Sequence, residues 1–140
     1  MDFYVLKDAG ASAGRLACRL SLMAWEQGHC IAVVAEDERA ARSLDELMWD
    51  FPQARFLPHE RDARDADVPV SIVLSPDDAG PGRDILINLA DGAVADPSRF
   101  SRLLEIVPAE ERQRAASREK YKHYRSLGLQ PGHHEIARTD

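Results

Sequence analysis

One unbroken apolar run constrains the fold of this 140-residue chain more than any other segment. Residues 30–35 read Cys-Ile-Ala-Val-Val-Ala, without a polar residue among them. A strand with one face in water alternates apolar and polar residues, so a short run without alternation is typical of a strand covered on both faces. The run therefore predicts a strand at the centre of a sheet that is flanked by helices.

Strand and helix patterns alternate along much of the remaining chain. Further short apolar runs predict strands at residues 3–6, 55–58, 70–74 and 84–89. Apolar residues at helical spacing predict helices that begin at Ala13, after Asp37, at Phe100 and at Pro108. Gly28 and Gly128 are placed to end the first and the last of these helices.

This order of elements predicts an α/β fold with an open, mostly parallel sheet of about five strands, flanked by helices and wound like a Rossmann fold. The turn-rich residues 76–82 predict a hairpin between the last two strands, and hence one antiparallel pair near the edge of the sheet. Residues 1–128 are expected to form a single domain and residues 129–140 a frayed tail. The charged residues 59–67 are expected to form a mobile loop.

Composition narrows the class of protein. The chain is 44% hydrophobic and 30% charged, and no apolar run approaches the roughly 20 residues that span a bilayer. Residues 1–7 lack the positive region and cleavage site of a secretory signal. Cys18 and Cys30 have neither metal nor redox spacing and are expected to be small buried hydrophobes, which suits a reducing compartment. The predicted location is therefore cytoplasmic.

The predicted last helix is the most basic part of an acidic chain. Residues 109–125 hold six Lys or Arg against three Glu, a balance of +3, whereas the whole chain carries −6, which leaves −9 elsewhere. A free nucleic-acid binder usually has a basic excess over its whole domain, because affinity comes from neutralising many phosphates. A small cationic face with tyrosines fits a short acidic peptide or a carboxylate better.

Helical spacing gathers the charged side chains of this segment. The residues that share one face are Arg114, Arg118, Tyr121 and Arg125, with Lys122 beside them. The neighbouring stripe, whose apolar members are expected to pack inward, is Ala116, Lys120, Tyr124 and Leu127. A run of Lys and Arg is more commonly a solvated surface without a partner, and the residues alone leave that alternative open.

The motifs of catalysis are incomplete in this chain. Gly10 and Gly14 lie between the first strand and the first helix, but they have the wrong number and spacing for a dinucleotide fingerprint, and no Gly-Lys-Ser/Thr follows. His59 has no nucleophile assigned to it, and His133-His134 has no accompanying cluster of metal ligands. We predict no catalytic residue, metal or cofactor, and keep a small Rossmann-like nucleotide-binding enzyme as the alternative.

Six blocks of residues, in order along nearly the whole chain, resemble a known family. They are Glu-Asp-Glu at 36–38, Leu-Asp-Glu at 44–46 with Trp49, Phe-Leu-Pro-His at 56–59, Arg-Asp-Ile-Leu-Ile-Asn-Leu at 83–89, Val-Pro at 107–108, and Arg-Glu-Lys-Tyr-Lys-His-Tyr-Arg at 118–125. Their order and spacing resemble the chi subunit of bacterial DNA polymerase III holoenzyme. The resemblance implies a non-catalytic accessory subunit of the clamp loader in DNA replication.

The resemblance also implies two partners and their sites. A chi subunit links the clamp loader, through the psi subunit, to the single-stranded-DNA-binding protein, so its contact with nucleic acid is mainly indirect. By position, the residues implied to bind the acidic C-terminal tail of that protein are Val107, Arg114, Arg118, Tyr121 and Lys122.

The residues implied to bind psi are Trp49 and Phe56, with Pro58 close by. In the family, an iron-sulfur repair helicase uses this same surface as an alternative to psi. Aromatic residues also pack in cores, and for Phe56 the sequence leaves core packing and interface equally open.

Overall fold

The computed structural model describes residues 1–8, 10–50, 57–63, 65 and 67–137. Its strands are β1 (Asp2–Leu6), β2 (Ile31–Val34), β3 (His59–Arg61), β4 (Val70–Val73), β5 (Ile85–Asn88), β6 (Arg102–Val107) and β7 (Gly132–Ile136). Its α-helices are α1 (Ala13–Glu26), α2 (Glu38–Asp50) and α3 (Glu111–Ser126), and two short 3₁₀ helices are η1 (Pro76–Ala79) and η2 (Pro97–Arg99). Within the described ranges, no helix is both long and apolar enough to cross a membrane.

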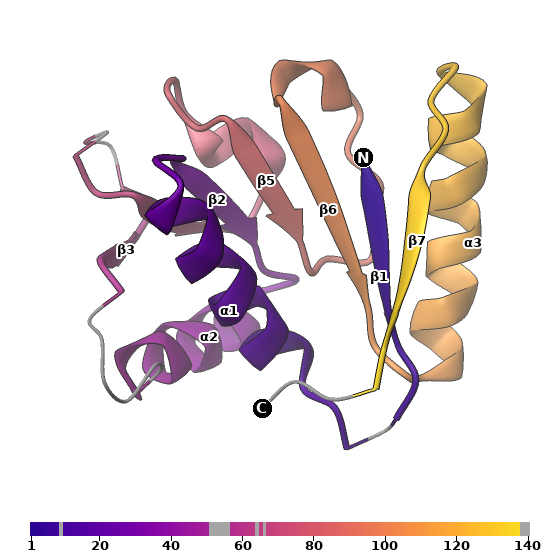
Figure 1. Ribbon diagram of the computed structural model, residues 1–140, viewed down its shortest axis with the longest axis horizontal. Helices are drawn as coiled ribbons and strands as arrows, with labels where there is room; N and C mark the ends of the chain where they lie inside the picture. The colour runs from indigo at the N-terminus through magenta and orange to yellow at the C-terminus, as the bar shows by residue number, and fades with distance from the viewer. Residues whose placement is uncertain (9, 51–56, 64, 66, 138–140) are drawn as a thin grey trace.

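The seven strands seen in these ranges form one sheet, in the order β3-β4-β2-β5-β6-β1-β7, and every neighbouring pair is parallel. The prediction of a single α/β domain with a mostly parallel sheet is confirmed (Figure 1). The sheet has seven strands rather than about five. β2 is interior, as its apolar run predicts, although the middle position belongs to β5.

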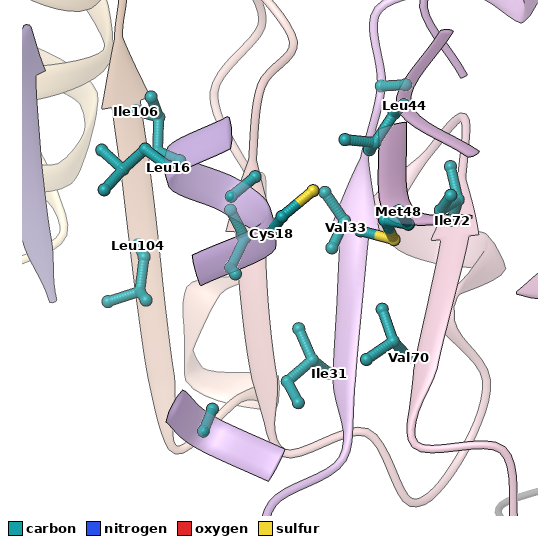
Figure 2. Packing of buried hydrophobic residues seen from close by; sticks show 14 of the residues in the cluster. Leu16, Cys18, Ile31, Val33, Leu44, Met48, Val70, Ile72, Leu104 and Ile106 are labelled. Atoms are coloured by element: carbon teal, nitrogen blue, oxygen red, sulfur yellow. The ribbon is translucent and has the colours of Figure 1, made fainter. Parts of the chain in front are cut away.

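Helices cover both faces of the sheet, which explains why β2 shows no alternation. Ile31 and Val33 pack in the core that includes residues of α1 and α2, whereas Ala32 and Val34 pack in the core that includes Tyr124 of α3. Figure 2 shows the first of these cores, in which Leu16 and Cys18 of α1 and Leu44 and Met48 of α2 lie over β2, β4 and β6. Successive residues of a strand point to opposite faces, so both sets must be apolar.

The two cysteines differ in their surroundings. Cys18 is fully buried, and burial raises the pKa of its thiol to about 12. Such a thiol is a small hydrophobe at neutral pH, as predicted. Cys30 is only partly buried, so the same prediction is wrong for that residue.

The predicted antiparallel pair is wrong. β4 and β5 lie on the two sides of β2 and are both parallel to it. The connection between them includes η1, where the Ser75 side chain accepts a hydrogen bond from Asp77 N. This connection crosses over β2 instead of folding back, so its turn residues mark a short helix and not a hairpin.

Three segments have a secondary structure that differs from the one predicted. The expected helix at 100–107 is β6, because Leu103, Leu104, Ile106 and Val107 are buried on both faces and a doubly covered strand lacks alternation. The expected frayed tail contains β7, which pairs with β1. The strand expected at 55–58 is displaced to β3 at 59–61, inside the expected mobile loop; Arg55 and Phe56 lie outside the described residues.

Candidate functional site

α3 begins and ends where the sequence places its signals, within a few residues. Glu111 lies in the first turn, where its negative charge meets the positive end of the helix dipole. Gly128 adopts φ of +85°, a conformation that favours glycine, and its N–H donates to Arg125 O at 3.0 Å. Pro108 lies before the helix rather than in its first turn.

The inner face of α3 is fixed by a buried polar network. Lys120 is 5% exposed, and its Nζ donates to Glu105 Oε1 at 2.8 Å and to the Ala90 carbonyl. Tyr124 donates its hydroxyl proton to Glu105 Oε2 and accepts from Val94 N at 2.9 Å. Glu105, on β6, is therefore satisfied on both oxygens although it is fully buried. The network joins α3 to β6 and to the loop after β5.

The protonation of this network follows from its burial. Loss of solvent raises the pKa of Glu105, while the nearby Lys120 ammonium opposes that rise. Burial, together with the neighbouring Glu105 charge, raises the pKa of Tyr124 well above its usual range. Tyr124 is therefore a neutral hydroxyl that donates, and it is a structural group.

Sequence reasoning missed this network, although one signal was present. Glu105 is the only charged residue in the run Leu-Leu-Glu-Ile-Val at residues 103–107. A charge inside an apolar run predicts a buried partner, because burying an unpaired charge strongly destabilises the folded state. The partner itself is not readable from sequence, since Lys120 lies among the cations that predict a surface.

The outer side of α3 carries the cations predicted to form the tail-binding face. Arg118 and Lys122 are exposed, and each makes a surface ion pair within the helix, to Glu111 at 3.1 Å and to Glu119 at 3.4 Å. Exposed pairs of this kind are worth little and exchange readily with other partners. Both cations are thus accessible to an acidic ligand.

Arg114 and Tyr121 join α3 to the edge of the sheet. Arg114 is half-buried, and its Nη2 donates to Leu6 O at 3.4 Å, at the end of β1. The Tyr121 ring lies 6.1 Å from the Phe3 ring of β1 and 5.5 Å from the His133 ring of β7. The structure therefore brings His133, which sequence reasoning had assigned to a tail, beside the predicted face.

Val107 lies beneath this region rather than on it. It is 4% exposed at the end of β6 and packs in the same core as Phe3 and Tyr124. Tyr121, half-buried against that core, is the apolar member of the predicted set that reaches the surface. The four residues Arg114, Arg118, Tyr121 and Lys122 are called the α3 surface below.

A second candidate surface surrounds Trp49, near the end of α2. Trp49 is 62% exposed, which is unusual for so large an aromatic residue. Its ring contacts the ring of His59 edge-on, with 5.0 Å between centroids. Pro58 is half-buried next to His59, whereas Phe56 lies outside the described residues. Trp49 and Pro58 are called the Trp49 surface below.

His59 supports Trp49 from inside the fold. It is buried, its Nδ1 donates to Leu57 O at 2.7 Å, and its Nε2 lies 3.1 Å from Asp45 Oδ1 of α2. These contacts hold the imidazole, which belongs to β3, against α2, where it supports the Trp49 ring. His59 is thus a buried structural residue.

The glycine loop before α1 is explained by local structure. The Ser12 hydroxyl caps α1 by accepting from Arg15 N at 3.1 Å, and Asp8 Oδ1 accepts from Gly10 N at 2.9 Å. A Cβ on Gly14 would lie only 3.0 Å from Leu47 Cδ2, so glycine permits the close approach of α1 and α2. Turn geometry and helix packing account for both glycines. No group of three or more metal-ligating side chains occurs in the part of the chain that the structure describes.

Comparison with known proteins identifies the family of this chain. Residues 1–132 match the family model described as DNA polymerase III chi subunit, HolC. The chain is 37% identical over 139 residues to the DNA polymerase III subunit chi of Pseudomonas aeruginosa, covering 99% of this chain and 97% of that protein. It is 30% identical over 134 residues to the subunit of the same name from Escherichia coli, covering 91% of each. The chain therefore belongs to the family of DNA polymerase III chi subunits, accessory subunits of the replication machinery.

Proposed function

We propose that this chi subunit is a non-catalytic bridge, which binds psi through the Trp49 surface and the acidic C-terminal tail of single-stranded-DNA-binding protein through the α3 surface. The observation that carries the proposal is the separation of the two surfaces. Trp49 rests on His59 of β3, Tyr121 rests on His133 of β7, and these are the terminal strands of the sheet (Figure 1). A protein with one docking surface at each edge can hold both partners at once.

The chemistry of the α3 surface supports an acidic peptide as its ligand. Arg118 and Lys122 present exposed cations, and the half-buried Arg114 adds a guanidinium, which can bind a carboxylate through two parallel bonds. The rest of the protein is acidic, so a polyanion of greater length would meet repulsion away from this face. A short tail that ends in a free carboxylate contacts only the cationic face and avoids the acidic remainder of the protein.

The chemistry of the Trp49 surface supports a protein partner that contributes apolar groups. Exposed aromatic residues on a rigid support are typical anchors of interfaces. Phe56 is proposed to extend the same surface. The repair helicase that uses this surface elsewhere in the family would compete with psi for it. We place the bridge in the cytoplasm, with the replication complex.

Co-elution of three purified proteins tests the bridge. Psi and single-stranded-DNA-binding protein are applied to a size-exclusion column with and without this chain. The proposal predicts a ternary peak only when the chain is present. Mutually exclusive binary complexes would contradict it, because they would mean that the two partners share one surface.

A further inference from the structure

The outer edge of β7 is an unfilled position in the sheet. β7 is the last strand in the sheet order, so no strand among the described residues pairs with its outer side. Gly132 N donates to Met1 O and Ile136 O accepts from Lys7 N, both at 3.0 Å. Backbone groups alternate in direction along a strand, so His133 and Glu135 point their N–H and C=O groups away from β1. Natural proteins usually cover or blunt such an edge, because it is a template for another strand.

This edge lies directly beside the α3 surface. The His133 ring stacks on the Phe3 ring at 5.5 Å and contacts the Tyr121 ring at the same distance. Figure 1 shows α3 running alongside β7. Arg118 lies between Arg114 and Tyr121 in sequence, and helical spacing puts all three on one face of α3, from which Tyr121 contacts His133 of β7.

We propose that the acidic tail binds as an extended strand added to the outer edge of β7. Its backbone bonds to the free groups of His133 and Glu135, and its acidic side chains on the α3 side face the cations of the α3 surface. The identity of the ligand rests on the proposed function. The new elements are the extended binding mode and the participation of β7. Strand addition gives affinity through main-chain bonds and selectivity through every second side chain.

Local charges allow this arrangement. Glu135 is the acidic side chain on β7, and Lys7 Nζ lies 3.3 Å from its Oε2. Both side chains are more than half exposed. Lys7 therefore offsets the negative charge of Glu135 at the far end of β7.

A proline substitution removes one of the outward donors while keeping the inner ladder. Proline is tolerated on an edge strand where its missing N–H would face solvent. Glu135→Pro is expected to weaken binding of a synthetic peptide with the acidic tail sequence by about fivefold to tenfold, the contribution of about one main-chain hydrogen bond. Glu135→Ala is the matched control, because it removes the same carboxylate and keeps the N–H; it should bind at least as tightly as the unaltered protein.

Amide hydrogen exchange measured by NMR on the unaltered protein provides a test that requires no variant. Peptide binding should slow exchange of the His133 and Glu135 amides, whereas the amides of His134 and Ile136, which already face β1, should change little. Strand addition would be overturned if the peptide bound with unchanged exchange at His133 and Glu135 and if the proline and alanine variants had equal affinities. The proposed function would then still stand. Absence of any binding would overturn both.

Discussion

The Lys120 ammonium lies 2.8 Å from the Glu105 carboxylate, and both side chains are buried beneath α3. One of the six cations of residues 109–125 is therefore internal and does not contribute to the charge of the binding face. Its role is to fix the helix on β6, so that the remaining cations are presented from a rigid element. Binding and stability thus depend on different residues of the same helix.

Lys120→Met should destabilise the fold by about 3 kcal/mol, because it leaves the buried Glu105 carboxylate without its counterion. Since burial already favours the neutral form of Glu105, the loss should be larger in mildly alkaline than in mildly acidic solution. Urea denaturation of the variant measures the effect. The double variant Lys120→Met/Glu105→Gln should recover part of the loss; an equal loss in both variants would mean that the ion pair is not its cause.

Acid should weaken the fold partly through Asp84. Burial disfavours the Asp84 carboxylate, but hydrogen bonds from His29, at 2.6 Å, and from Cys30 N, at 2.8 Å, lower its pKa below the usual value of 3.8. A lowered folded pKa gives stability that is complete above the unfolded pKa and is lost as pH falls through the folded value. Asp84→Asn should therefore reduce the melting temperature at neutral pH. On acidification below about pH 4, the melting temperature of the variant should fall by less than that of the unaltered protein. Asp78→Asn, which changes an exposed aspartate, is the control and should leave both values unchanged.

Arg118→Ala should weaken binding of the acidic tail peptide by about 2 kcal/mol, roughly thirtyfold, and leave psi binding intact. The affinity of the unaltered protein should also fall as salt is raised, because exposed charge pairs are screened. Calorimetric titration at two salt concentrations measures both effects. Arg39→Ala removes an exposed cation from α2 and should not affect the peptide. An affinity that is independent of salt would instead indicate mainly apolar anchoring.

Trp49→Ala should weaken psi binding to a similar degree, about 2 kcal/mol, and leave the tail peptide unaffected. The ring is 62% exposed, so its loss should cost little stability. Pull-down or surface plasmon resonance with purified psi measures the change. Met23→Ala, another exposed apolar residue but on α1, is the matched control. Loss of both partners in the Trp49 variant would indicate misfolding or one shared site.

Local patterns in the sequence predict the interior of the fold well. The apolar run of β2, the helical spacing of α1 and the cap at Asp37, whose Oδ1 accepts from Ala40 N at 2.8 Å, all encode structure within a few residues of chain. The same is true of the cationic face of α3. These elements are predictable because their signals do not depend on distant partners.

The sequence does not predict the features that depend on contacts between distant segments. β7 has little apolar alternation and is held instead by pairing with β1 and by ring stacking of His133 on Phe3 and His134 on Tyr4. β6 contains the buried Glu105, whose charge is paired by Lys120, fifteen residues later in the chain. Lys120 is indistinguishable from a surface cation until the two elements are brought together.

Titration calorimetry measures directly whether this chi subunit binds the acidic tail. The protein is titrated with a synthetic peptide that carries the acidic C-terminal sequence of the host single-stranded-DNA-binding protein, and with the same peptide lacking its final residue. We expect saturable binding of the intact peptide and its loss on truncation, because the shortened peptide still ends in a carboxylate but lacks the apolar last side chain that we propose packs against Tyr121 beside the cations of the α3 surface. Absence of binding, or equal binding of both peptides, would contradict it.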